Sequence, residues 1–303
     1  MPTLLTVEKL KRRIIDFSGP GDDPRRHPSI YAAAIRDTRP ITDVYVCPAP
    51  GPAAENAMAP PPSPDDPGWR PLRPGEPWGG DPNNPDKPEE RIPWGMPVDG
   101  GHNHWLRARL RVPEEWRGRT VLLHMAWEGR GQASVESILY INGTAVAGID
   151  EPHPAVVLPE WTHTGEHEVL IRAYAPYRRP FGGLSLQLRD DAIFQLAMLM
   201  YAALGAAETM RDSDVTRHAL IERLNRAYNM LDLSEGWGSE LFARSAAQAL
   251  EFQRAELTAG LQAGTRPIVL ATGHAHMDVA WLWPLWRTRQ KVAHTVATAL
   301  HLM

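Results

Sequence analysis

The sequence predicts a multidomain α+β protein in which a β-sandwich is followed by a helical bridge and then by a βα unit. Three observations lead to this prediction. Residues 102–188 hold several short segments that alternate apolar and polar side chains, residues 190–264 carry apolar side chains at helical spacing, and residues 266–303 join an apolar strand to an amphipathic helix. A chain of 303 residues is long enough for two or three domains with sizeable cores.

The composition narrows the class of protein. A net charge of −4 gives no electrostatic basis for binding nucleic acid or an anionic membrane. Cys47 is the only cysteine, which excludes an internal disulfide and a CxxC metal site. No segment approaches the ~20 apolar residues of a transmembrane helix, and the N-terminus lacks the uninterrupted apolar stretch of a signal peptide. We therefore expect a soluble, cytoplasmic protein that binds neither nucleic acid nor membranes.

The first hundred residues are predicted to form two segments. Residues 1–20 contain a short amphipathic helix that docks on the rest of the protein, with a membrane-surface helix as the alternative. Residues 21–100 are rich in Pro and Gly and are expected to be extended, apart from a strand at residues 41–46. Trp78 and Trp94 lie in this segment, and we expect them to be buried against a folded neighbour.

Residues 101–190 are predicted to form the accessory β-sandwich. Asn142 and Gly143 give the strongest hairpin signal, because both central residues of a type I′ turn need a positive φ. The order of the strands resembles the galactose-binding-like jelly roll, which accompanies many glycoside hydrolases, and we expect it to act as a structural spacer. The expected strands cover residues 105–112, 120–127, 138–141, 144–147, 167–174 and 184–188.

Residues 191–264 are predicted to form the helical bridge of three helices. The first follows Asp190, the second begins near Ser213 or Asp214, and the third begins after Ser239. Each of these residues can cap a helix N-terminus with its side-chain oxygen. Gly264 is expected to end the third helix.

The candidate site lies in the last segment, residues 265–303. An apolar strand at residues 266–272 leads to His274, His276 and Asp278, which alternate along the chain and so can share one face. Two imidazoles and a carboxylate at the end of a strand can bind a divalent metal. The residues leave two other interpretations open: histidines that bond only to backbone at the strand end, and an amidohydrolase-type metal hydrolase.

Longer stretches around these residues carry a family resemblance. Residues 271–284 (ATGHAHMDVAWLWP) and 291–300 (KVAHTVATAL) closely resemble the opening of the catalytic domain of family 38 α-mannosidases, in the cytosolic/vacuolar branch. Residues 112–121 (VPEEWRGRTV), 140–143 (YING) and 194–196 (FQL) are similar to the N-terminal region of that branch. The resemblance covers most of the chain after residue 78.

This resemblance implies a retaining α-mannosidase that removes terminal mannose from α-mannosides and oligomannose glycans with the help of a divalent metal, zinc or cobalt. It makes His276 and Asp278 metal ligands and Trp281 a substrate-binding residue, while His274 supports the ligands without binding the metal. Residues 265–303 would be the first βα unit of an α/β barrel that this chain leaves incomplete. The full-length protein would be a homo-oligomer.

The chain departs from the family pattern in length. The family's nucleophilic Asp, its acid/base Asp and its second metal-binding His lie further downstream, so no catalytic residue is expected within this chain. A retaining glycosidase needs two carboxylates at the scissile bond. We therefore expect an N-terminal fragment without turnover of its own, in which the residues after Gly264 are loosely packed or expose apolar surface. The alternative from another class is a non-catalytic carbohydrate-binding or assembly module.

Overall fold

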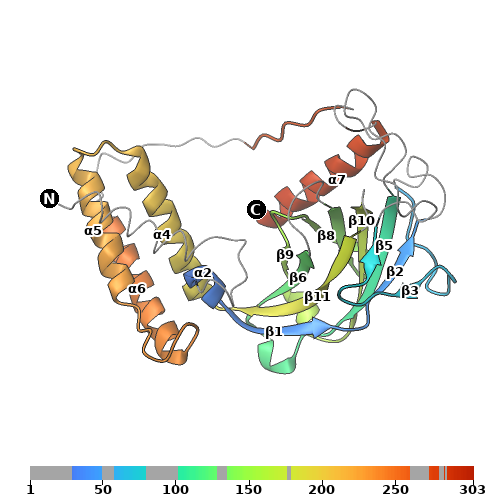
Figure 1. The fold of residues 1–303 in the computed structure, drawn as a ribbon, viewed down its shortest axis with the longest axis horizontal. Helices are drawn as coiled ribbons and strands as arrows, with labels where there is room; N and C mark the ends of the chain where they lie inside the picture. The colour runs from blue at the N-terminus through green and yellow to red at the C-terminus, as the bar shows by residue number, and fades with distance from the viewer. Residues whose placement is uncertain are drawn as a thin grey trace. The chain divides into compact units, whose positions relative to one another are not determined.

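The backbone forms two compact units, and each is described by itself below. Unit 1 comprises residues 1–37 and 188–271, and unit 2 comprises residues 38–187 and 272–303. The N-terminal helix predicted within residues 1–20 lies outside the described residues. The computed structural model describes residues 29–49, 58–79, 102–127, 135–175, 179–259, 273–279, 283 and 285–303 (Figure 1).

Two antiparallel sheets build most of unit 2 (Figure 1). Two short 3₁₀ helices, Glu114–Trp116 and Glu160–His163, lie between their strands. In the described residues the first sheet has the order β1 (Ile35–Ile41), β11 (Arg179–Arg189), β6 (Thr120–Trp127), β9 (Ala155–Val157), with β4 (Pro77–Trp78) also paired to β11. The second has the order β3 (Arg70–Pro71), β2 (Tyr45–Pro48), β5 (His102–Leu110), β10 (His167–Ala175), β7 (Glu136–Ile141), β8 (Thr144–Ile149).

The strand pattern of the sandwich follows the alternation in the sequence. Along β5, Leu106 and Leu110 are fully buried while Arg107 and Arg109 turn to the other face. The hairpin between β7 and β8 is confirmed, because Asn142 and Gly143 have φ values of 50° and 78°. The alternating residues therefore place one face of this sheet in an apolar core and leave a second face to be covered by other elements.

The strand expected at residues 41–46 is wrong. The chain instead forms β1 up to Ile41 and β2 from Tyr45, because it leaves the first sheet and joins the second between them. Trp78 is buried as expected, with its ring edge-on to His104 at 6.0 Å and to Phe181 at 6.4 Å between ring centroids. Trp94 lies outside the described residues.

Unit 1 is a helical block with its own apolar core. Asp190 caps α4 by accepting hydrogen bonds from the amides of Ala192 and Ile193, and Asp214 caps α5 through the amide of Thr216. The core residues come from all four described helices of this unit. These helices are α2 (Ile30–Ala33), α4 (Asp191–Thr209), α5 (Val215–Asn229) and α6 (Glu240–Ala259).

Helix α4 is apolar over most of its length and is, by length and composition alone, able to cross a membrane. A core helix of a soluble protein meets the same criterion. Seven of its residues, from Ile193 to Ala207, are buried in the core of unit 1.

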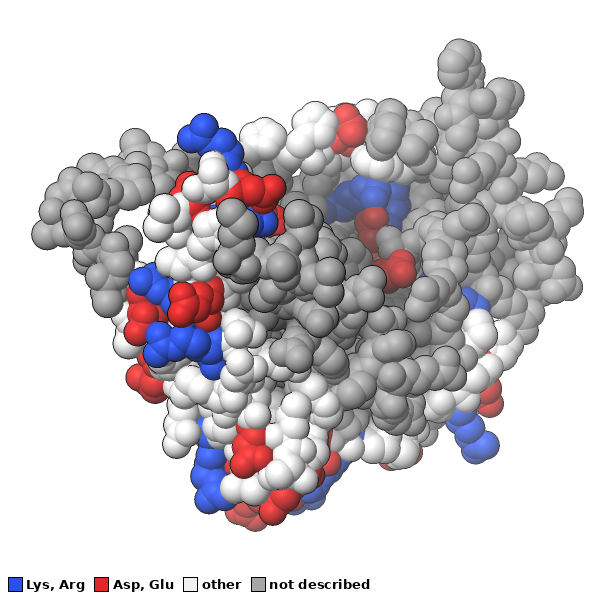
Figure 2. All heavy atoms as spheres, turned by 60° about the vertical axis from the view of Figure 1, so that its left-hand side comes forward, with Lys and Arg blue, Asp and Glu red and all other residues white. Residues whose placement is uncertain are grey.

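Acidic and basic side chains are interspersed on the described surface that Figure 2 shows, and neither sign forms a continuous patch there.

The last helix, α7 (Leu285–Leu302), belongs to unit 2. It packs against β8 and β7 of the six-stranded sheet (Figure 1). The helix that the sequence assigned to the start of a new domain therefore covers the second face of the sandwich sheet.

Candidate metal-binding site

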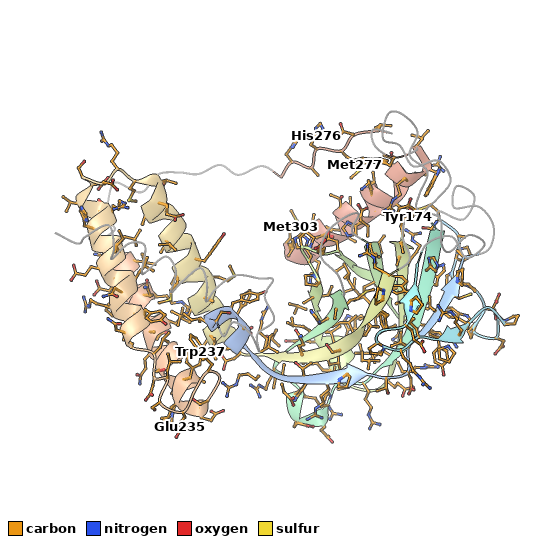
Figure 3. The ribbon with its side chains drawn as sticks, in the orientation of Figure 1. Tyr174, Glu235, Trp237, His276, Met277 and Met303 are labelled. Carbon is orange, nitrogen blue, oxygen red and sulfur yellow. The ribbon has the colours of Figure 1, made fainter. Side chains whose placement is uncertain are left out.

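The predicted ligands lie on a segment without helix or strand, residues 273–279, ahead of α7. The Nε2 atom of His276 lies 3.1 Å from Oδ1 of Asp278, and their side chains are 76% and 42% exposed. The ring of His274 stacks on that of His276, with 6.5 Å between centroids and 28° between planes. Figure 3 shows His276 on this segment, with its side chain away from the core of the sandwich.

The structure thus brings His276 and Asp278 together and leaves His274 as a neighbour of the His276 ring. An imidazole nitrogen and a carboxylate oxygen at this separation can both reach one divalent ion, and both are ligand types that zinc accepts. A catalytic zinc usually has three protein ligands. The described residues contain no group of three or more metal-ligating side chains, so the pair fits part of a metal site rather than a closed one.

Two further predicted features of the site fall outside the described residues. They are Trp281, the expected substrate-binding residue, and the strand expected at residues 266–272. Helix α7 is described from Leu285 onward. The contacts of α7 with the sheet therefore show how the chain that follows residues 273–279 is held.

Helix α7 exposes its apolar side. Leu285, Val292, Val296 and Leu300 recur at helical spacing and are 45% to 67% exposed. The opposite side, with Arg287, Thr288, Gln290 and His294, is buried on the sheet. The expectation of exposed apolar surface in this part of the chain is confirmed for the described residues.

An ion-pair cluster holds the polar side of α7 on the sheet. Oε2 of Glu136, at the start of β7, accepts a hydrogen bond of 2.9 Å from Arg287, and its Oε1 accepts one from Lys291. The side chain of Arg287 is 5% exposed and that of Glu136 is 19% exposed. Because both cations come from α7 and share one strand carboxylate, Glu136 fixes the rotation of the helix about its axis.

Aromatic and amide contacts extend this cluster. The Arg287 guanidinium lies 3.8 Å from the centroid of the Tyr174 ring, which also meets Trp286 edge-on with 5.8 Å between ring centroids. Nε2 of Gln290 donates a hydrogen bond of 2.6 Å to Oδ1 of Asn103 in β5. Strands β5, β7 and β10 therefore all bind the same side of the helix.

Helix α7 also packs closely against strand β8. A Cβ atom at Gly148 would lie 2.2 Å from Oγ1 of Thr298 and 2.7 Å from the ring of His294. Only glycine leaves room for the helix there. Nε2 of His294 lies 3.6 Å from Oδ2 of Asp150, and burial lowers the pKa of His294 more than this carboxylate raises it. His294 is therefore neutral at pH 7.

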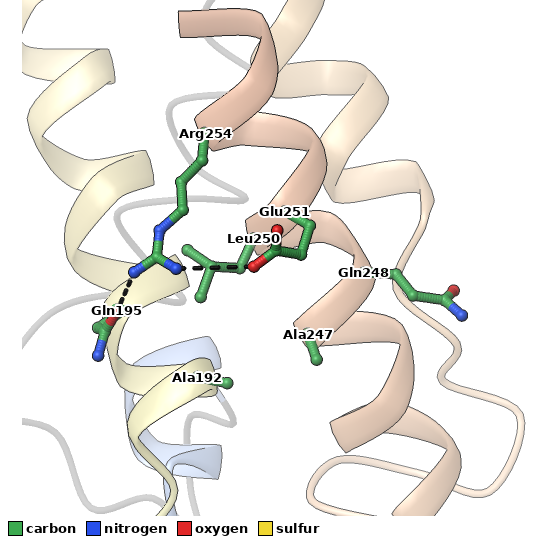
Figure 4. Close-up of a pocket in the computed structure, with 7 residues that line it drawn as sticks. All are labelled: Ala192, Gln195, Ala247, Gln248, Leu250, Glu251 and Arg254. Carbon is green, nitrogen blue, oxygen red and sulfur yellow. Dashed lines mark hydrogen bonds and ion pairs between the residues drawn. The ribbon is translucent and has the colours of Figure 1, made fainter. Parts of the chain in front are cut away.

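Unit 1 has a separate open groove of about 550 Å³ between α4 and α6 (Figure 4). Arg254 crosses it, with an ion pair of 3.6 Å to Glu251 and a hydrogen bond to Oε1 of Gln195. Ala192, Ala247 and Leu250 supply the apolar part of the lining. Glu251 is the only carboxylate among the described residues that line the groove, whereas the predicted ligands His276 and Asp278 lie in unit 2.

Sequence reasoning missed Glu136 and the buried polar side of α7. One signal was present, because Arg287, Gln290, Lys291 and His294 recur at helical spacing opposite the apolar stripe. That pattern is typical of a solvated helix face, and only the position of Glu136 in space shows it to be an interface.

An imidazole and a carboxylate are both donor types that divalent metals accept, and His276 and Asp278 lie in the part of the chain that matches a known family. Residues 267–303 match the family described as "Glycosyl hydrolases family 38 N-terminal domain". Alpha-mannosidase 2C1 of Homo sapiens is 25% identical over 222 residues, which cover 66% of this chain and 20% of that protein. Alpha-mannosidase G of Dictyostelium discoideum is 20% identical over 224 residues, which cover 66% of this chain and 19% of that protein.

These matches confirm the resemblance: the chain is related to the α-mannosidases of glycosyl hydrolase family 38. The matched region spans about a fifth of the length of the curated relatives. Among solved structures, a β-glucuronidase of Bacteroides uniformis is similar over 50% of this chain and 18% of that chain, with 16% identity and a TM-score of 0.31. A likeness at this TM-score supports no argument about function.

Proposed function

We propose that this chain provides the accessory sandwich and the first two metal ligands of a retaining, metal-dependent α-mannosidase. The observation that carries the proposal is the contact of 3.1 Å between His276 and Asp278 within the segment that matches family 38. The substrate class is that of α-mannosides and oligomannose glycans, by analogy with relatives named as α-mannosidases.

In this proposal, Nε2 of His276 and the carboxylate of Asp278 hold a divalent ion, with zinc favoured and cobalt as the second choice. A bound ion of this kind polarises hydroxyl oxygens of a sugar and favours an oxocarbenium-like transition state. His274 keeps the His276 ring oriented by stacking, and Trp281 supplies an apolar platform for the sugar ring. Asp278 is occupied as a ligand and cannot also act as a nucleophile or a general acid.

The apolar stripe of α7 supports the proposal that residues 265–303 begin an α/β barrel. Helices of such barrels bury an apolar side on the strands, and here that side is exposed while the polar side is seated on the sandwich. Since the curated relatives are about five times longer than the matched region, we propose that the remaining barrel elements cover the stripe. The sandwich, for which we propose the galactose-binding-like jelly-roll topology, would then serve as a spacer that holds α7.

The location, the partners and the oligomeric state of the protein are proposed from the same resemblance. The cytosolic/vacuolar branch suggests a cytoplasmic protein without nucleic-acid or membrane partners, and a homo-oligomeric full-length form. An assembly module is the second candidate function, because the stripe on α7 would serve equally well as a docking surface for a separate polypeptide.

A zinc titration by calorimetry tests the metal-binding part. We expect one zinc-binding event, which His276→Ala and Asp278→Ala each remove. His153→Ala is a matched control, since His153 forms a second exposed contact with an aspartate, 2.9 Å from Oδ1 of Asp150. Equal zinc affinity in the wild type and in His276→Ala would contradict the proposal.

An activity assay tests the proposal that this chain has no mannosidase activity by itself. The 303-residue chain with zinc is expected to release no mannose from an aryl α-mannoside above the blank. Release of mannose that depends on Asp278 would show that this chain completes the site alone. Binding of mannosides by the chain with His276→Ala, at the wild-type affinity, would instead favour the non-catalytic module.

A further inference from the structure

The outer side of α4 is apolar, in contrast to its neighbour α6 in unit 1. No charged residue lies between Ala192 and Ala207, yet within this stretch Met198 is 39% exposed and Tyr201 is 50% exposed. A helix that is apolar on all sides is normally buried on all sides. We therefore expect another element to cover the outer side of α4. Helix α6, by contrast, exposes mainly polar side chains at helical spacing, namely those of Glu240, Arg244, Gln248, Glu251 and Arg254.

The groove between α4 and α6 lies next to this apolar side. Gln195 lines the groove, and Met198 follows it by three residues and so lies on the same side of α4. Apolar side chains form part of the lining, and the charged residues Glu251 and Arg254 border them (Figure 4). An open apolar groove with charged residues beside it is a surface on which an amphipathic helix can lay its apolar side.

Residues 7–17 of the same unit have the complementary pattern. Leu10, Ile14 and Phe17 recur at helical spacing, which predicts a helix with one apolar side. This segment has four basic and two acidic residues, a net charge of +2. The described residues of unit 1 include 12 acidic and 8 basic residues, a net charge of −4. Residues 7–17 therefore match unit 1 both in apolar pattern and in charge.

The chain that follows this segment leads directly to α4. Ser29 caps α2, and α2 packs on α4, where the ring of Tyr31 lies 5.7 Å from that of Phe194 between centroids. Phe194 directly precedes the groove residue Gln195. The connecting residues 18–28 can span up to ~36 Å when extended, and α4 itself is about 28 Å long. The connection is therefore long enough for residues 7–17 to reach the groove.

From these observations we infer that residues 7–17 dock as an amphipathic helix in the groove between α4 and α6, with Leu10, Ile14 and Phe17 on its apolar lining. The basic residues of the segment then face solvent and the acidic surface of unit 1. A second copy of the chain would cover α4 as well, but it would bring two negatively charged units together and leave the apolar side of residues 7–17 without a surface. Docking joins the start of the chain to unit 1 and closes the groove to other partners.

Paramagnetic broadening of amide signals tests this inference on the 303-residue chain. A nitroxide on Gln248→Cys lies at the groove, and the native Cys47 is buried and does not compete for the label. We expect the label to remove the amide signals of residues 7–17. A nitroxide on Glu222→Cys, at an exposed position of α5 that does not line the groove, is the control and should broaden these signals less.

Two serine variants of the chain labelled at Gln248→Cys test the orientation of the segment. Ile14→Ser should restore the signals of residues 7–17, whereas Arg12→Ser, on the opposite side of the predicted helix, should leave them broadened. Mixing isotope-labelled chain that lacks the nitroxide with nitroxide-labelled chain that lacks the isotope should give no broadening, because the docking is intramolecular. Broadening in this mixture would assign the groove to a second copy and overturn the inference. Full signals of residues 7–17 beside the Gln248→Cys label would overturn it as well.

Discussion

Glu136 is the residue whose loss should most directly release α7 from the sheet. Glu136→Gln keeps the size of the side chain but removes the charge that pairs with Arg287 and Lys291. Breaking a fully buried ion pair costs about 3–5 kcal/mol. Glu136 and Lys291 are each about one-fifth exposed, and the amide oxygen of Gln still accepts a hydrogen bond, so we reduce this to about 2 kcal/mol.

Since about 1.4 kcal/mol corresponds to a factor of ten, opening of α7 should become roughly 30 times more frequent in Glu136→Gln. Amide exchange of residues 286–300 measures this opening locally. Glu166→Gln is the control, because the Arg109–Glu166 pair is separated by 3.8 Å and both side chains are more than half exposed. Equal protection of α7 in the wild type and in Glu136→Gln would refute the assignment of Glu136 as the anchor.

Two further predictions concern the same interface, each with a comparison variant. Gly148→Ala should destabilise the seat of α7 by about 1–3 kcal/mol in chemical denaturation, because its Cβ would lie 2.2 Å from Oγ1 of Thr298. Gly205→Ala in α4 should instead be neutral or stabilising by up to about 1 kcal/mol, since no atom lies within 4 Å of the added Cβ. A larger loss of stability in Gly205→Ala than in Gly148→Ala would contradict the packing described for these two glycines. Burial lowers the pKa of His294, so the stability of α7 should be complete above pH ~6.5 and fall as the pH drops through the lower folded value. Amide exchange of α7, corrected for the pH dependence of the intrinsic exchange rates, measures this loss of stability. His294→Gln should make the stability of α7 less dependent on pH. Burial also lowers the pKa of His301, so His301→Gln should remove only the contribution of His301 to the pH dependence.

Local signals were sufficient to predict most elements of the fold. Asn142 and Gly143 predicted the turn of the β7–β8 hairpin, and Asp190 and Asp214 predicted two helix starts, because each of these residues determines the backbone next to it. The strand expected at residues 41–46 was wrong, since the alternation of side chains does not reveal where a chain moves from one sheet to another.

At the candidate site, too, contacts between residues close in the sequence could be predicted and contacts between distant residues could not. The spacing of His276 and Asp278 predicted that they would meet, and the structure places them 3.1 Å apart. The position of α7 could not be predicted, because its apolar periodicity indicated a helix but suggested the wrong side for burial. The determining partner, Glu136, lies 151 residues from Arg287 in the sequence.

The central claim is that His276 and Asp278 supply the first part of a zinc site. X-ray absorption at the zinc edge, on the chain with one equivalent of zinc, tests it most directly. We predict a shell of nitrogen and oxygen ligands at about 2.0–2.2 Å that includes one imidazole. The imidazole contribution should disappear in His276→Ala and remain in His153→Ala. An unchanged imidazole signal in His276→Ala would contradict the account.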